Sequence, residues 1–396
     1  MAKKRFTGVD FRDALIKLRG VEHVGTVESA DDFLTAPTPE ELHAIYSDGF
    51  IGASPDFITF EERNEVKDYL ASMPRLYDVF PWARGIGKGK LNAPFLACLH
   101  FSPSWGGDEA QTRGSCVSHS NTNAAEIDHA NDALHGETVY KGRMCKENIY
   151  RARGYNGDGW YCSPAAKYVG PGGQGGFLVR DRYESPTGEV VDLSEFSRAT
   201  ENWAGQGSRG CPEWLEAIAR RNQCKWIIPI NSMEEYRDSM ALGFGVSVCS
   251  GYGYSSETDS SGVARQTGSW AHAMAHACCD DTPWANQKYG GMLGLIIQSW
   301  ARWNRQNGKF DGLPSMPVGS FGARGNDVAK MIRSDSFALA GLYGWERIGW
   351  EAFDVTALTD HLQSSDVQDF YKARQERSAE FATKCRDEGV SQWVTV

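Results

Sequence analysis

Residues 111–120 read QTRGSCVSHS, and the segment that begins at Cys116, CVSHSNTNAAEIDHANDAL, is interpreted as a helix. Cys116 follows a Gly-Ser turn, so it stands at the expected start of that helix. The unpaired N–H groups of a helix N-terminus favour a negatively charged sulfur, and a thiol is a nucleophile only as its thiolate. Cys116 is therefore either a small buried packing residue or a nucleophile.

The composition predicts a soluble protein of one large domain with appendages, or of two domains. The chain has 396 residues and a net charge of −10, which argues against a protein that binds nucleic acid by neutralising phosphates. No apolar run approaches the roughly 18 residues of a membrane span. The N-terminal sequence MAKKRFTGVDFRDALIK lacks the apolar core of a secretory signal. None of the 10 cysteines forms a C-x-x-C pair, so we expect reduced thiols and a cytoplasmic location.

Residues 1–95 are predicted to be a helical N-terminal extension. Apolar spacing and helix-cap patterns place its helices at 11–18, 39–47 and 59–72. The stretch GIGKGK at 85–90 lacks the Gly-Lys-Ser/Thr ending of a phosphate loop, so we interpret it as a flexible linker.

Residues 346–396 are predicted to be a C-terminal extension with an amphipathic helix at about 365–388. One face of this helix is apolar. It either docks on the chain's own body or binds a protein partner.

The central region, 96–345, alternates glycine-rich loops, short β-like runs and a few helices. Helices are predicted at 212–222 and at 232–243, the second capped by Ser232 with Glu235, and β-like runs at 243–250, 268–279 and 291–300. The last two runs are joined by DDTPWANQKYG, which we interpret as a turn-rich connection. We therefore expect these two runs to pair as antiparallel neighbours.

A nucleophilic cysteine needs a histidine within hydrogen-bond reach, usually from another element. His119 lies one turn along the same helix, where it is expected to pack inward. His272 and His276 lie four residues apart in one β-like run, so a regular strand would turn both to the same side. These residues alone leave the choice of base open.

Four segments, in this order, resemble papain-like cysteine peptidases. RGSCVSHS is similar to the family's nucleophile segment, and Asn156-Gly157-Asp158-Gly159-Trp160 to its Asn-Gly-Gly loop. HAMAHACCDD at 272–281 resembles the histidine strand, in a register that selects His272 over His276. IIQSWARW at 296–303 resembles the family's Asn-Ser-Trp-Gly segment, with Gln298 at the place of the asparagine.

The resemblance covers about residues 96–345 and implies an α+β, two-lobed papain-like fold. A helical lobe would carry Cys116, and an antiparallel β-rich lobe would carry His272 and Gln298. The implied mechanism uses a Cys116 thiolate and a His272 imidazolium, with Gln298 accepting a hydrogen bond from His272 Nδ1–H. The Cys116 backbone N–H and Gln111 would form the oxyanion hole.

The same resemblance implies a peptide or protein substrate and no metal or organic cofactor. Trp300 would shield the contact between His272 and Gln298 from water. The substrate cleft is expected to be formed by Asn156, Gly157, Asp158, Gly159 and Trp300.

The sequence also departs from the family pattern. Gln111 stands five residues before Cys116 rather than six, and Gln298 replaces an asparagine. Arg113 occupies the position of the family's first cysteine in this segment, so the family's disulfide at that cysteine is expected to be absent.

Three alternatives stay open. The first is a non-catalytic papain-like module with a structural or interaction role in a larger assembly, such as a virion. The second is an amidase or cell-wall hydrolase on a related fold. The third is a metal site built from His272, His276, Cys278 and Cys279, although adjacent cysteines on a strand point to opposite faces.

Overall fold

The computed structural model describes residues 68–69, 71–106, 109–135, 138–156, 158–299, 316–332 and 335–342. The helices predicted at 11–18, 39–47 and 365–388 lie outside these residues, and so does most of the helix predicted at 59–72.

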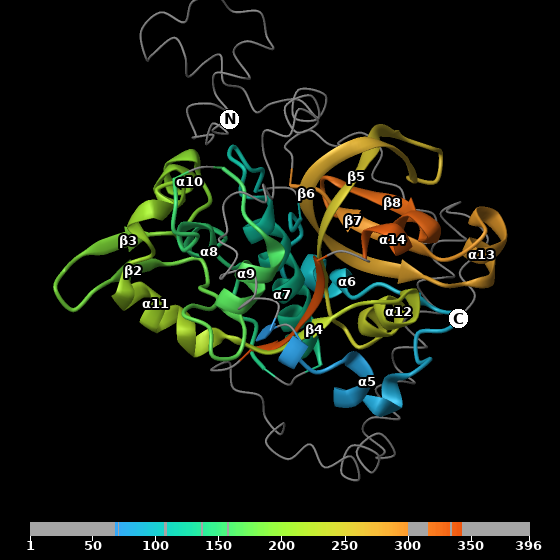
Figure 1. The fold of residues 1–396 in the computed structure, drawn as a ribbon, viewed down its shortest axis with the longest axis horizontal. Coiled ribbons are helices and arrows are strands. Elements are labelled where there is room, and N and C mark those ends of the chain that lie inside the picture. Colours follow the sequence, from blue (N-terminus) through green and yellow to red (C-terminus); the bar gives the residue numbers. More distant parts are fainter. Residues whose placement is uncertain are drawn as a thin grey trace, which may run out of the picture.

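A long central helix separates a helical side of the molecule from a β-sheet. This helix, α7 (Cys116–Leu134), lies between the two in Figure 1, with the helical side on the left and most of the sheet on the right. The two-lobed α+β arrangement predicted from the sequence is thus present. The helical side contains α8 (Glu147–Arg151), α9 (Cys162–Val169), α10 (Arg198–Ala204), the 3₁₀ turn Gly207–Arg209, α11 (Glu213–Ala219) with the 3₁₀ turn Arg220–Asn222, and the hairpin of β2 (Arg182–Glu184) and β3 (Val190–Asp192).

The sheet is antiparallel throughout its named pairs, in the order β4-β9-β5-β6-β7-β8, with β1 also paired to β6. Its strands are β1 (Leu91–Asn92), β4 (Cys224–Pro229), β5 (Val246–Thr258), β6 (Ala264–Asp280), β7 (Leu293–Ile297), β8 (Ser320–Arg324) and β9 (Asp335–Leu342). The predicted antiparallel pairing of the runs at 268–279 and 291–300 is confirmed by the register Ala275↔Ile297 between β6 and β7.

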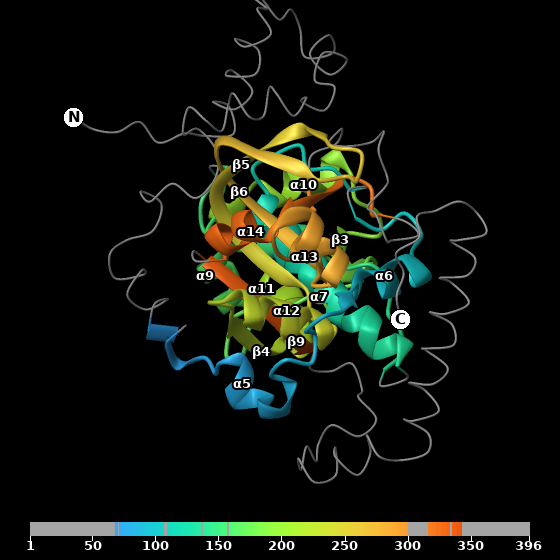
Figure 2. The same cartoon turned by 90° about the vertical axis from the view of Figure 1, so that its right-hand side faces the viewer.

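Both faces of the sheet are covered. Alternate residues of β9 show this: Phe337 and Leu339 pack with α7 and α9, whereas Ala338 and Ala340 pack in another cluster with α12 (Met233–Ala241) and α14 (Gly325–Met331). Figure 2, which faces the sheet side, shows α14 and α13 in front of the strands. The seam between α7 and the sheet is therefore an interior surface.

The central helix has the boundaries read from the sequence, but it is buried along most of its length. Fifteen of its 19 residues are buried, many of them polar, so they need partners within the protein. Its approach to the sheet requires a glycine at Gly245, where an added Cβ would lie 2.6 Å from the Ala124 Cα. A side chain at position 245 would push the helix away from β5.

Two elements differ from the sequence predictions around β6. The connection 281–291 is not all turn: it contains the helix α13 (Pro283–Tyr289), begun by the Thr282 side chain, which accepts from the Ala285 N–H, and ended at Gly290 with φ of 72°. Strands β5 and β6 also extend beyond the predicted runs into a long hairpin. Its polar, half-exposed sequence carries little hydrophobic signal.

Part of the predicted N-terminal extension packs into the main core. Leu76, Phe80 and Ala83 belong to the same cluster as the α12 side of the sheet. They lie on α5 (Leu76–Val79) and the 3₁₀ turn Pro81–Ala83, which precede β1 and α6 (Phe95–Phe101). Residues 76–92 are therefore continuous with the body formed by the rest of the described chain.

The segment 85–90, predicted to be a flexible linker, is bound to two carboxylates. The N–H groups of Gly85 and Gly87 donate to Asp238 at 2.6 and 3.2 Å, and the N–H of Gly89 donates to Asp281 at 2.9 Å. The glycines bring successive N–H groups to these acceptors, so this interpretation as a linker is wrong.

The remaining predicted helices are confirmed. The one at 212–222 forms as α11 and the following 3₁₀ turn, and the one at 232–243 forms as α12. Ser232 accepts from the Glu235 N–H as its cap pattern predicted. Of the residues that the structure describes, none forms a helix long and apolar enough to cross a membrane.

Replacing Asp238 by Asn should lower the free energy of unfolding at pH 7 by about 2 kcal/mol, because the buried carboxylate accepts from two N–H groups and Tyr77. Burial alone would raise the pKa of Asp238, but the bonds from Arg237, Gly85 and Tyr77 lower it overall. This contribution is present above the unfolded pKa of about 4 and is lost as pH falls through the folded value.

Urea unfolding at neutral and acid pH measures both effects, with the exposed Asp181→Asn as the control. A variant as stable as the wild type at pH 7 would contradict this account of the 85–90 segment.

Candidate functional site

Cys116 lies where α7 meets the sheet. It is the first residue of α7 and is 1% exposed. The backbone N–H groups of Ala273, Val117 and Cys116 itself lower the pKa of this thiol, so they lie close enough to act on the sulfur. Since Ala273 follows His272 in β6, the thiol lies beside the strand that carries the predicted base.

His272 and Gln298 form a buried pair. The His272 Nε2 atom lies 2.6 Å from Gln298 Oε1, and the two residues are 3% and 0% exposed. Gln298 directly follows β7 and is held there by a bond from its N–H to the Gly319 carbonyl. The prediction that Nδ1 makes the bond is wrong, because from this position the Gln298 side chain reaches the other ring nitrogen. An amide oxygen only accepts, so the neutral ring carries its proton on Nε2 and its lone pair on Nδ1.

Gln111 lies next to this pair through Ser299. Its N–H donates to the Ser299 carbonyl at 2.9 Å, and its side-chain oxygen accepts from the Ser299 hydroxyl. The Gln111 amide nitrogen donates to the Arg113 carbonyl at 2.9 Å, three residues before Cys116. The structure therefore brings Gln111 to the site, fastened to the residue after Gln298, and its role in an oxyanion hole stays a prediction.

Of the predicted cleft residues, Asp158 and Gly159 support the turn that precedes the thiol. Asp158 is 7% exposed and accepts from the Gly114 N–H at 3.2 Å and from the Tyr150 hydroxyl at 3.0 Å. The Gly159 N–H donates to the Gly114 carbonyl at 3.1 Å. These two hydrogen bonds, one to the Asp158 side chain and one from the Gly159 N–H, fix the position of Gly114.

The other cleft residues are not brought to the thiol or are not described. Asn156 accepts from the Ser208 N–H and hydroxyl at 3.0 and 2.7 Å, on the exposed side of the 3₁₀ turn at 207–209. Gly157 and Trp300 lie outside the described residues.

The sequence reasoning missed Glu201 on α10. This carboxylate is 1% exposed and accepts from the Thr112 N–H at 2.7 Å, from the Thr112 hydroxyl and from the Ser115 hydroxyl at 2.6 Å. His119 Nε2 lies 4.0 Å from Glu201 Oε1, the oxygen that accepts from Ser115, and the predicted inward packing of His119 is confirmed by its 2% exposure. A single glutamate in a seven-residue helix carries no sequence signal for this role.

Burial favours the neutral forms of both central groups. It raises the pKa of Cys116 to about 11, against the effect of the three backbone bonds, and lowers the pKa of His272 to about 3. Burial therefore opposes the thiolate–imidazolium pair expected at rest and favours a neutral thiol and a neutral imidazole at pH 7.

His276 and the adjacent cysteines belong to the core. His276 Nδ1 lies 3.3 Å from the Tyr236 hydroxyl, and burial lowers the pKa of His276 to about 3. Cys278 and Cys279 lie in different core clusters, as expected for neighbours on a strand. A single ion could not be reached by both sulfurs, so this geometry disfavours the metal alternative.

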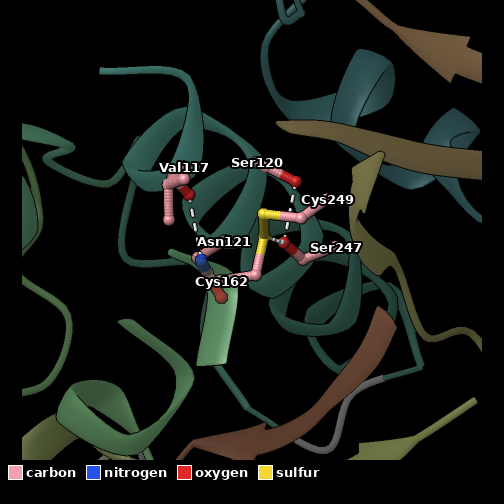
Figure 3. The surroundings of a disulfide bond; sticks show 6 residues. All are labelled: Val117, Ser120, Asn121, Cys162, Ser247 and Cys249. Carbon is pink, nitrogen blue, oxygen red and sulfur yellow. Dashed lines mark hydrogen bonds between the residues drawn. A yellow bond between two sulfur atoms is a disulfide. The ribbon is translucent and has the colours of Figure 1, made fainter. Parts of the chain in front are cut away.

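A disulfide joins the helical side to the sheet next to the site. Cys162, at the start of α9, is bonded to Cys249 on β5, with their Cα atoms 5.9 Å apart (Figure 3). Cys249 is opposite Ala273 in the β5–β6 register. The prediction that all thiols are reduced is wrong for these two residues, because the fold brings together cysteines 87 positions apart. Reduced thiols therefore no longer support the cytoplasmic location. The free cysteines among the described residues are Cys98, Cys116, Cys145, Cys211, Cys224, Cys278 and Cys279.

Three of the solved structures that resemble the chain are a cysteine protease and two procathepsins. Xylellain, a cysteine protease from Xylella fastidiosa, has 13% identity and a TM-score of 0.39, over 73% of this chain and 95% of its own. Digestive procathepsin L 3 of the Tenebrio molitor larval midgut has 13% identity and a TM-score of 0.35, over 84% and 97%. ProCathepsin B S9 from Trypanosoma congolense has 11% identity and a TM-score of 0.34, over the same shares. No family model and no curated protein matches the chain. At these similarities the functional proposal rests on the geometry of the site.

Reduction of the Cys162–Cys249 bond should lower the free energy of unfolding by about 2–4 kcal/mol, because it releases a long closed loop in the unfolded chain. Urea unfolding with and without a dithiol reductant measures this in the wild type and in Cys249→Ser. The variant should be insensitive to the reductant. Equal stability of the oxidised and reduced wild type would contradict the expectation.

The alkylation rate of Cys116 by iodoacetamide should rise continuously with pH from about 6 to about 9, because the thiolate is the reactive form and burial raises the thiol pKa to about 11. Peptide mapping by mass spectrometry separates Cys116 from the other cysteines. A rate that is already at a plateau at pH 6 would instead reveal an ion pair with His272.

Proposed function

We propose that the protein is a papain-like cysteine peptidase that cleaves peptide bonds with Cys116 as nucleophile and His272 as base. One observation carries the proposal: Cys116 begins a buried helix beside β6, where His272 is bonded to Gln298, and the backbone N–H of Ala273, the residue after His272, lowers the pKa of the Cys116 thiol. A nucleophile, a base and a group that orients the base are the three parts of this chemistry.

The proposed reaction begins as Cys116 Sγ attacks the carbonyl carbon of a peptide bond and its proton passes to His272. Nδ1 is the accepting nitrogen, because the Nε2–H donates to Gln298. His272 then gives that proton to the leaving amine, which departs as the C–N bond breaks. A water molecule that loses a proton to His272 attacks the thioester, and the acid product leaves as Cys116 regains its proton.

Transfer from a neutral thiol to a neutral imidazole suits a dry site. Burial disfavours both ions separately, so the charges would appear together, during attack, rather than at rest. The backbone N–H of Cys116 is the first donor to the oxyanion in this scheme, and the Gln111 amide is the proposed second donor. Gln298 stabilises the imidazolium as it forms.

A second function is favoured by the same burial. Cys116 is 1% and His272 3% exposed, so a substrate reaches them only after the surroundings move. A papain-like module that has kept the residues and lost the activity would be buried in this way and would act as a structural or interaction protein. The test below separates the two.

In the active protein, His272→Ala should lower hydrolysis of a fluorogenic peptide library by about 10²–10⁴, the contribution of a general base. Cys116→Ala should abolish it. His276→Ala is the matched control: it removes a histidine of the same strand that contacts Tyr236, so the activity per folded molecule should be retained.

A papain-directed epoxide gives the same information without a known substrate. Stoichiometric labelling of Cys116 that is lost in His272→Ala supports the peptidase, since the proton taken by His272 is the one delivered to the opened epoxide oxygen. Labelling that is absent, or equal in the two proteins, would refute the peptidase and favour the interaction module.

A further inference from the structure

Ser115 stands at the N-cap position of α7 and does not cap the helix. Its hydroxyl accepts no bond from the first turn, and its backbone angles, φ −92° and ψ 13°, differ from those of an extended capping residue. Other Ser and Thr residues at helix starts behave differently. Ser197, Ser232 and Thr282 are all extended, and each accepts from an N–H of its own helix.

The Ser115 hydroxyl is taken by Glu201. It donates to Glu201 Oε1 at 2.6 Å, while the Thr112 N–H and hydroxyl converge on Oε2. Both oxygens of the buried carboxylate are thereby occupied from the segment that leads into Cys116. Gly114, which lies between Thr112 and Ser115, donates its N–H to Asp158 Oδ1.

A capping serine would compete with the thiol for donors. An N-cap hydroxyl accepts from the second or third N–H of its helix, here Val117 or Ser118. The Val117 N–H lies in the first turn of the helix, next to Cys116, and it lowers the pKa of the Cys116 thiol, so it is placed to stabilise a negative charge on the sulfur. A Ser115 hydroxyl turned toward the helix would therefore draw this donor away from a negative charge on the sulfur.

We infer that Glu201 is a positioning residue that holds the Ser115 hydroxyl away from α7 and so reserves the first N–H groups of the helix for the charge that develops at Cys116. The inference rests on the proposed function for its catalytic meaning. Its structural part concerns only which N–H groups of α7 are available to the Cys116 sulfur.

Other charged or titratable groups that act on Cys116 are Asp158 and Tyr155, on the loop between α8 and α9; His119 lies one turn along α7 and contacts Glu201, and His272 precedes Ala273 on β6. Removing the Glu201 charge would by itself ease thiolate formation, which opposes the capping effect. The test must therefore compare two proteins that both lack this charge.

The test measures iodoacetamide alkylation of Cys116 at pH 9 in the full chain, resolved by peptide mapping. In Glu201→Leu the side chain has no atom that accepts from or donates to Ser115, whereas a glutamine amide would donate to the Ser115 oxygen and keep it in place. The released hydroxyl is then able to cap the helix. Loss of one donor to the thiolate should slow alkylation about tenfold relative to Ser115→Ala/Glu201→Leu, which has no hydroxyl to compete.

Two controls separate this effect from damage to the fold. Thr112→Val removes one donor to Glu201 and leaves Ser115 bound, so its alkylation rate should stay within about twofold of the wild type. Glu201→Asp keeps an acceptor for Ser115 and should alkylate faster than Glu201→Leu. Urea unfolding of each variant reports stability separately.

Equal alkylation rates in Glu201→Leu and the double variant would overturn the inference, and so would unfolding of both proteins while Ser115→Ala alone changes nothing. Neither result depends on peptidase activity, since alkylation needs only the thiolate. Failure of the proposed function appears separately, as epoxide labelling that does not depend on His272.

Discussion

The rest of the structure depends on the burial of a polar helix. α7 has a helical lobe on one side and a sheet on the other, so its buried polar side chains are stabilised by partners inside the protein. Glu126 accepts from the Trp105 indole at 2.6 Å and the Met144 N–H at 2.6 Å, and Asp128 accepts from the Gly341 N–H of β9 at 2.8 Å. Ser120 is bonded to Ser247 of β5 at 2.7 Å. The helix thereby fixes the segments of Trp105 and Met144 and two strands of the sheet in one arrangement.

The same burial determines the electrostatics of the site. In a dry interior an isolated charge is costly, so Cys116 and His272 favour their neutral forms, and charge is stabilised only by fixed donors. Those donors are backbone N–H groups at the start of α7 and in β6. The carboxylates nearby have other roles: Asp158 and Glu201 are occupied by Gly114, Thr112 and Ser115, and so shape the turn that presents the thiol.

The seam between the two lobes is held by covalent and polar links close to the site. The Cys162–Cys249 bond fastens α9 to β5, one strand away from His272, and Cys162 belongs to the same apolar cluster as Cys116 and Ala273 (Figure 3). Gln111, five residues before the thiol, is bonded to Ser299. The disulfide and these bonds together restrain the separation of the helical side from the segments that carry His272 and Gln298.

The sequence by itself determined the features that arise from neighbouring residues: the start of a helix at Cys116 after a Gly-Ser turn, the cap of α12 at Ser232, and the antiparallel pairing of the runs that became β6 and β7. These follow from hydrophobic periodicity and from short-range hydrogen bonds, both legible in a window of a few residues. It also led from the family-like order of motifs to the His272–Gln298 contact, although not to the ring nitrogen used. Only the tertiary structure decided that Ser115 binds Glu201, 86 residues away, and that Cys162 pairs with Cys249, 87 residues away. It also decided that the glycines of 85–90 donate their N–H groups to carboxylates instead of forming a flexible linker. Such contacts join single residues across long separations, and one residue without a repeat leaves no pattern in the chain. The protonation of the site belongs to this second group, because burial is a property of the packed interior and not of any segment.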